Sequence, residues 1–146
     1  MTFQDYLDKT YTVASEEKEI LDFLSNKELD KINIRAAKSS LQVLIENSIG
    51  KSKKILQHYN CSIIPNESRD AIKILHDCEA ISDEIHSSLH GAIGFRNALI
   101  HDYMSFNSAI LVDIVKNRSY LELFSFLMDN CQYRDVICKR IENYSF

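Results

Sequence analysis

Arg96, Asn97, His101 and Tyr103 lie within one short segment, and their side chains suit chemistry on a phosphate ester. Histidine titrates near neutral pH, so His101 can act as a general base or as a general acid. The guanidinium of Arg96 stays charged, and its planar fork matches the oxygens of a phosphate. Such side chains can serve, for example, the attack of an RNA 2′-hydroxyl on its neighbouring phosphate, which needs a base, an acid and a cation but no metal ion or cofactor.

One copy of the segment supplies only one histidine, whereas this reaction uses both a base and an acid. A two-fold homodimer brings the same surface of both copies to one interface, so two histidines and two arginines would share a cleft. We expect such a homodimer. On a straight helix Arg96 and His101 point about 140° apart. Either the helix ends or loosens near His101, or the long arginine side chain sweeps across.

The spacing of Arg96 and His101 is by itself a weak pattern. It also fits the commoner case of a surface arginine in a salt bridge and a half-buried histidine bonded to the backbone. Asp102 can orient the imidazole or simply be solvated. We favour the solvated interpretation and leave Asp102 out of the catalytic set.

The elements that must position this segment have helical periodicity, since apolar residues recur every three or four positions. The stripes are Ile74, Cys78, Ile81 and Ile85; Leu41, Leu44, Ile45, Ile49 and Ile55; and Leu121, Phe124, Leu127, Met128, Cys131, Val136, Ile137 and Ile141. No segment alternates apolar and polar residues over a sustained length, so we expect no sheet.

Polar residues that favour helix N-termini divide these stripes. The expected starts are Ser15, a residue within 28–35, Asn66, Ser82 (a start or a kink), Asn107 and Ser119, the last helix running toward Tyr144. One proline and three glycines predict few loops. We predict an all-α, up-and-down antiparallel bundle of four to five helices in a single domain, residues 1–146.

The composition limits the ways in which this chain could bind nucleic acid. A net charge of -4 excludes a protein that grips nucleic acid by bulk charge, so attraction to RNA must be local or helped by a partner. Lys51, Lys53 and Lys54 form a small basic cluster that we interpret as a solvated helix end. Lys116 and Arg118 follow the motif and can extend a positive field near the cleft.

The cysteines and histidines do not predict a metal site. The four cysteines have no zinc-ligand spacing and are interpreted as buried thiols. His86 and His90 are four apart but have no evident third ligand. The N-terminus lacks the pattern of a signal peptide, and no apolar run approaches 18 residues, so we expect a cytoplasmic protein without a membrane span.

The segment from Gly94 to Tyr103 closely resembles the signature of the HepT family of HEPN proteins, in which an arginine, four to six residues, a histidine, any residue and a tyrosine follow in order. The segment from Pro65 to Ile72 also looks like that family's start of the preceding helix. The resemblance is clear over about residues 60–120.

The resemblance implies a HEPN-like helical bundle that dimerises with the motif at the cleft. It implies a metal-independent endoribonuclease that acts on RNA as the toxin of a type VII HEPN/MNT toxin–antitoxin pair. The implied partner is an MNT-type, MntA-like nucleotidyltransferase that silences the toxin by AMPylation. Carried over by position, Arg96 and His101 are catalytic, Asn97 supports them, and Tyr103 accepts AMP.

Two alternatives stay open. The chain can be a non-catalytic HEPN partner that binds RNA or nucleotide, or that scaffolds the nucleotidyltransferase; its acidic net charge supports this. It can also be a helical dimerisation module with no role on RNA.

Overall fold

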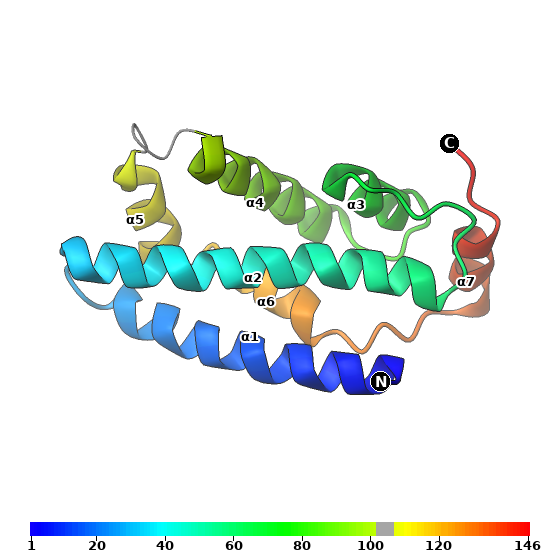
Figure 1. Cartoon of the computed structure of the whole chain (residues 1–146), viewed down its shortest axis with the longest axis horizontal. Helices are drawn as coiled ribbons and strands as arrows, with labels where there is room; N and C mark the ends of the chain where they lie inside the picture. The colour runs from blue at the N-terminus through cyan, green and yellow to red at the C-terminus, as the bar shows by residue number, and fades with distance from the viewer. Residues whose placement is uncertain (102–106) are drawn as a thin grey trace.

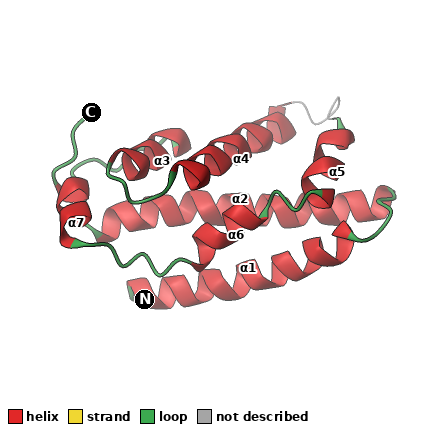
Figure 2. Ribbon diagram, turned by 180° about the vertical axis from the view of Figure 1, so that it is seen from behind, coloured by secondary structure: helices red, strands yellow, loops and turns green. Residues whose placement is uncertain are grey.

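The computed structural model describes residues 1–101 and 107–146, whose regular structure is entirely α-helical (Figures 1 and 2). The helices are α1 (Phe3–Ser25), α2 (Lys31–His58), α3 (Ser68–Asp77), α4 (Asp83–His101), α5 (Ser108–Lys116), α6 (Leu121–Met128) and α7 (Asp135–Glu142). The predicted all-α bundle is confirmed. The described residues form seven helices rather than four or five. The chain breaks at residues 78–82, where Ser82 was expected to be a start or a kink, and at residues 129–134, inside a segment expected to be one helix.

The two longest helices, α1 and α2, form an antiparallel pair (Figure 1). A capping box starts α1: Thr2 Oγ1 accepts from the Asp5 backbone N–H at 3.0 Å, and the Asp5 carboxylate accepts from the Thr2 N–H. The start expected at Ser15 is therefore wrong, since the helix is already established there. Asp30 caps α2 within the expected window, accepting from the Asn33 N–H at 2.8 Å.

Helix α4, which packs against α3, carries the segment that contains Arg96 and His101. Ser82 begins α4 as expected, because its hydroxyl accepts from the Ile85 N–H at 3.2 Å. The expected cap at Asn66 is one residue off, since Glu67 occupies the N-cap of α3 without a side-chain bond. The apolar stripe that begins at Ile74 crosses the break between α3 and α4, so both helices face the same core.

The C-terminal part of the chain is divided more finely than its periodicity predicts. Asn107 caps α5 as expected, accepting from the Ala109 N–H at 2.9 Å. The single helix expected from Ser119 toward Tyr144 is wrong, because residues 129–134 separate α6 from α7. Cys131 in this connection has a φ of 57°, a left-handed conformation that a continuous helix excludes.

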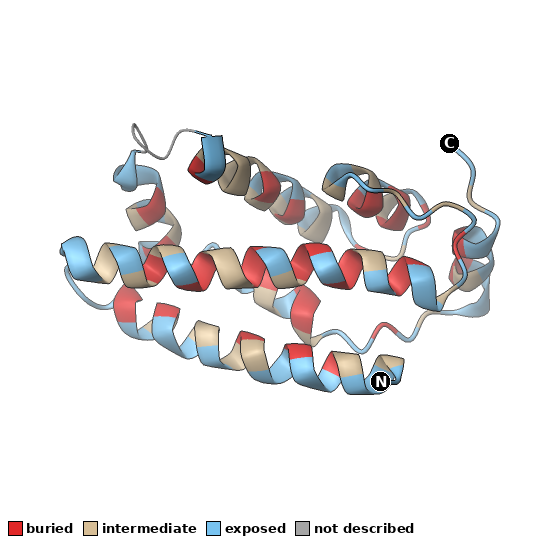
Figure 3. Ribbon diagram, in the orientation of Figure 1, coloured by how far each residue is buried: buried red, intermediate tan, exposed pale blue. Residues whose placement is uncertain are grey.

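The core consists of two apolar clusters, one centred on α2, α3 and α4 and the other on α1, α2 and α5. Phe95 of α4 packs against both. Helix α6 contacts α1, α2 and α4, and it lies between them when seen from behind (Figure 2). Buried residues concentrate on the inward sides of these helices (Figure 3). No described helix is both long enough and apolar enough to cross a membrane.

Candidate active site

His101 is the last residue of α4, and its side chain is exposed. The residues that follow lie outside the described part of the chain, so the expectation that the helix ends or loosens near His101 stays a prediction. An exposed imidazole can meet a ligand that approaches from solvent, which a proton-transfer group requires.

Arg96 lies one and a half turns earlier and points across to α2 rather than toward His101. Its Nη1 donates to Oε1 of Glu46 at 3.2 Å, and its side chain is 22% exposed against 55% for that of Glu46. Its Nε is buried and has no hydrogen-bond partner. Within the described part of the chain, no hydrogen bond or ion pair joins Arg96 to His101.

Asn97 is half-buried on α4 between these two residues. Tyr103 and Asp102 lie outside the described residues, so the predicted AMP acceptor has no structural account here. A single copy therefore presents one partly exposed guanidinium, turned to α2, and one exposed imidazole at His101.

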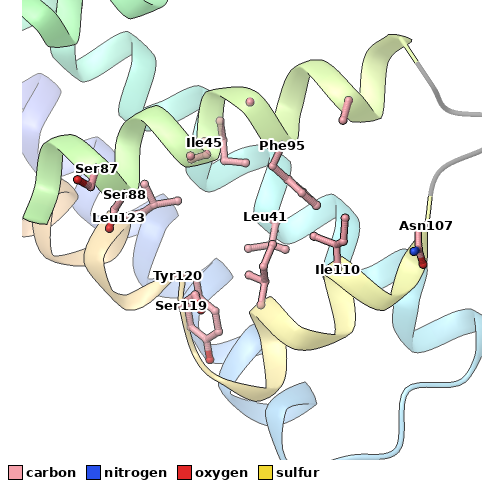
Figure 4. A pocket seen from close by; sticks show the side chains of 15 residues that line it. Leu41, Ile45, Ser87, Ser88, Phe95, Asn107, Ile110, Ser119, Tyr120 and Leu123 are labelled. Atoms are coloured by element: carbon pink, nitrogen blue, oxygen red, sulfur yellow. The ribbon is translucent and has the colours of Figure 1, made fainter.

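An apolar depression of about 680 Å³ adjoins this segment, between α4 and α5 and floored by α2 and α6. Phe95 of α4, Leu41 of α2 and Ile110 of α5 face into it (Figure 4). Its wall on α4 is made of small residues, Ser87, Ser88, Gly91, Ala92, Gly94 and Ala98. Ile100 and Ile110 are 55% and 53% exposed beside it. This end of the molecule therefore presents apolar surface next to His101.

The basic residues singled out from the sequence do not extend this site. Lys51 is fully buried, which corrects the interpretation of its cluster as a solvated helix end. Lys53 donates to the Asn66 carbonyl at 2.8 Å. Lys116 donates to the Lys27 carbonyl and Arg118 to Ser25 Oγ, so both bind the end of α1.

Three other histidines, His76, His86 and His90, form a separate group on α3 and α4. His76 contacts Asp83 at 2.7 Å and stacks on His86, their ring centroids 4.1 Å apart. Burial, with the charges of His76 and His90, lowers the pKa of His86. Among the described residues, no three histidine, cysteine or acidic side chains are placed to hold one metal ion.

Glu46 is the site residue that the sequence did not indicate. It lies fifty positions before Arg96, and no motif surrounds it. The only available signal was that α2 holds a single acidic residue among six lysines and arginines.

Known proteins resemble this chain in sequence and in fold. An mRNA nuclease HepT from Shewanella oneidensis is 33% identical over 66 residues, which are 45% of this chain and 48% of that protein. The match thus spans about half the length of that relative. A crystal structure described as a toxin-antitoxin with AMP-PNP aligns with a TM-score of 0.72 over 94% of this chain and 99% of its own, at 21% identity. That likeness shows the fold.

The sequence model of a family described as Ribonuclease HepT-like matches residues 5–129. The match covers most of the chain and includes Arg96, Asn97, His101 and Tyr103. The chain therefore belongs to the HepT-like family.

Proposed function

We propose that this protein is a metal-independent endoribonuclease, the toxin of a type VII HEPN/MNT toxin–antitoxin system. The observation that carries the proposal is the family match, which spans Arg96 and an exposed His101 at the end of α4. The relative named mRNA nuclease HepT supports RNA as the substrate class.

In the proposed reaction the 2′-hydroxyl of RNA attacks the adjacent phosphorus, and the bond to the 5′ oxygen of the next nucleotide breaks. One His101 imidazole takes the hydroxyl proton, and a second, protonated imidazole gives a proton to the leaving oxygen. The Arg96 guanidinium stabilises the extra negative charge on the phosphate oxygens. Asn97 supports Arg96 and His101. The products are a 2′,3′-cyclic phosphate and a free 5′-hydroxyl.

The second imidazole comes from a second copy of the chain. Exposed Ile100 flanks His101, and the apolar depression beside Ile110 is open on this face. Apolar surface of this kind favours burial between copies, and an isologous interface would place two His101 side chains together. Light scattering at micromolar concentration tests this step; a monomeric mass argues against a composite site.

Regulation by a nucleotidyltransferase extends the proposal. An MNT-type antitoxin would transfer AMP from ATP to Tyr103, two residues beyond His101. A bulky anionic nucleotide there would block the cleft and repel RNA phosphate. Support comes from the solved toxin-antitoxin of the same fold, whose description includes AMP-PNP. Incubation with the antitoxin and ATP should add an AMP-sized mass to the wild type, and Tyr103→Phe should take up none.

The deciding experiment is RNA cleavage by the purified protein in excess EDTA, with His101→Ala beside it. Cleavage should survive EDTA, disappear in the variant and leave 2′,3′-cyclic phosphate ends. Cleavage that needs a divalent ion, or that persists in His101→Ala, contradicts the proposal. The intact mass of the sample, measured first, excludes a protein already silenced at Tyr103.

A second candidate is a non-catalytic partner that binds RNA or nucleotide, or that scaffolds the antitoxin. The net charge of -4 favours it, as does the carboxylate of Glu46 beside Arg96, which weakens the local attraction for RNA. An unmodified wild-type protein that binds RNA or the antitoxin but cleaves nothing would establish this alternative.

A further inference from the structure

Glu46 occupies an unusual position on α2. It is the only acidic residue in a helix that carries six lysines and arginines. The residues three and four positions away on the same helix are Gln42, Val43, Ile49 and Gly50, none of them charged. Glu46 therefore has no ion-pair partner one turn along its own helix. Its partner is Arg96, which reaches it from α4 at 3.2 Å.

The ion pair with Glu46 matters because of the surroundings of the Arg96 guanidinium. The Arg96 Nε is buried without a hydrogen-bond partner, which is unfavourable for a charged group that could otherwise turn to water. Its Nη1 is occupied by Glu46. No hydrogen bond joins Nη2 to another described residue, and 22% of the side-chain surface of Arg96 is exposed, so the guanidinium keeps a donor edge that can meet an oxygen ligand.

We propose that Glu46 is a positioning residue for Arg96: it holds Nη1 from α2, so that the Nη2 edge of the guanidinium is directed to the RNA phosphate. The inference rests on the proposed ribonuclease function. An arginine side chain has many rotamers, and a guanidinium fixed before RNA binds loses less freedom when it engages the phosphate. Positioning should therefore act on the catalysed step more than on RNA affinity.

A carboxylate beside a phosphate site also has an opposite effect, because it repels RNA. The two effects predict different results for Glu46→Gln, which keeps an acceptor oxygen but removes the charge, and for Glu46→Ala, which removes both. If Glu46 positions Arg96, the alanine variant should lose at least tenfold in kcat with little change in KM, and the glutamine variant should retain most of the kcat of the wild type. If Glu46 only repels RNA, both variants should have a lower KM and no loss of kcat, and the proposal is overturned.

A matched control is Gln42→Ala, one turn earlier on the same side of α2. It should leave kcat and KM unchanged, because Gln42 has no contact with Arg96 among the described hydrogen bonds. In an Arg96→Lys background, Glu46→Ala should cost much less than tenfold, because a lysine does not have the guanidinium edge that Glu46 orients. An undiminished loss there would contradict action through Arg96.

A measurement that does not depend on cleavage separates this inference from the proposed function. The Arg96 Nε–H signal in NMR spectra can be assigned by its loss in Arg96→Ala. Its order parameter should be near the rigid value of about 0.85 in the wild type and fall below about 0.6 in Glu46→Ala. An unchanged order parameter overturns the positioning role even if RNA is cleaved. A rigid wild-type Arg96 that loses order in the variant supports it even if no RNA is cleaved, an outcome that contradicts only the proposed function.

Discussion

Lys51 and Arg96 each reach from one helix of this bundle to another, Lys51 from α2 to the end of α6 and Arg96 from α4 to α2. Lys51 is fully buried, and its Nζ donates to the carbonyls of Phe126 and Asp129, both at 2.6 Å. Arg96 keeps part of its surface exposed, makes one ion pair among the described residues and leaves its Nε without a partner.

Lys51 therefore stabilises the fold, whereas Arg96 keeps donors that can bind a ligand. The last carbonyls of a helix have no partner inside the helix, and Lys51 supplies one to α6 from a different element. Burial lowers the pKa of Lys51, and the two carbonyls offset part of that cost. Arg96 donates to no backbone carbonyl of the described residues, so within this part of the chain its remaining donors are not committed to the structure.

The variant with the largest expected effect on this comparison is Arg96→Ala. RNA cleavage should fall by about 10²–10³-fold, the usual cost of removing one donor to a developing oxyanion. The free energy of unfolding should change by less than about 1 kcal/mol, because the Arg96–Glu46 pair is partly solvated. Cleavage kinetics and urea denaturation measure the two effects. Arg134→Ala, at an exposed site beside α7, is the control and should cleave normally.

The converse change is Lys51→Met, which keeps the length of the side chain but removes its donors. The carbonyls of Phe126 and Asp129 would lose a buried partner, so the free energy of unfolding should fall by about 2–4 kcal/mol. Below the unfolding transition, RNA cleavage should be close to that of the wild type. Lys54→Met is the control, since Lys54 is exposed. Equal stability of the two variants would refute the distinction between the two cations.

The smallest effect is expected at Tyr120, a second satisfied interior group, whose hydroxyl donates to the Asp22 carboxylate at 2.6 Å. Tyr120→Phe should lower the free energy of unfolding by about 1–2 kcal/mol at pH 7. Urea denaturation measures this, with exposed Tyr11→Phe as the control.

The same variant should alter the response to alkali. Burial and the Asp22 carboxylate raise the pKa of Tyr120 in the folded protein. The unfolded chain loses the phenolic proton near pH 10 while the folded chain keeps it, so the stability present below about pH 10 is lost as the pH rises further. Tyr120→Phe should make this alkaline loss shallower. A pH profile as steep as that of the wild type would contradict the assignment.

Local sequence patterns predicted several elements well. The caps at Ser82 and Asn107 and the apolar face of α2 are where spacing places them, because each depends on groups within four residues along the chain. The helix start expected at Ser15 is wrong for a related reason. Its serine–glutamate pattern is a valid start signal, but the capping box at Thr2 begins the same helix earlier.

Other features depended on contacts between helices. The periodicity of residues 121–141 continues through the break between α6 and α7, because residues on both sides of the break face the same core. Nothing in that stretch indicates that Lys51, more than seventy positions earlier, would bind the backbone at the end of α6.

The sequence by itself determined the all-helical class and the segment that contains Arg96 and His101. Those properties follow from short-range periodicity, capping and side-chain chemistry. Only the tertiary structure decided that Arg96 turns to Glu46 and that Lys51 becomes a buried cap. Such pairs form between residues fifty or more positions apart, and which side chains meet depends on how the whole core sets the position of each helix against the next.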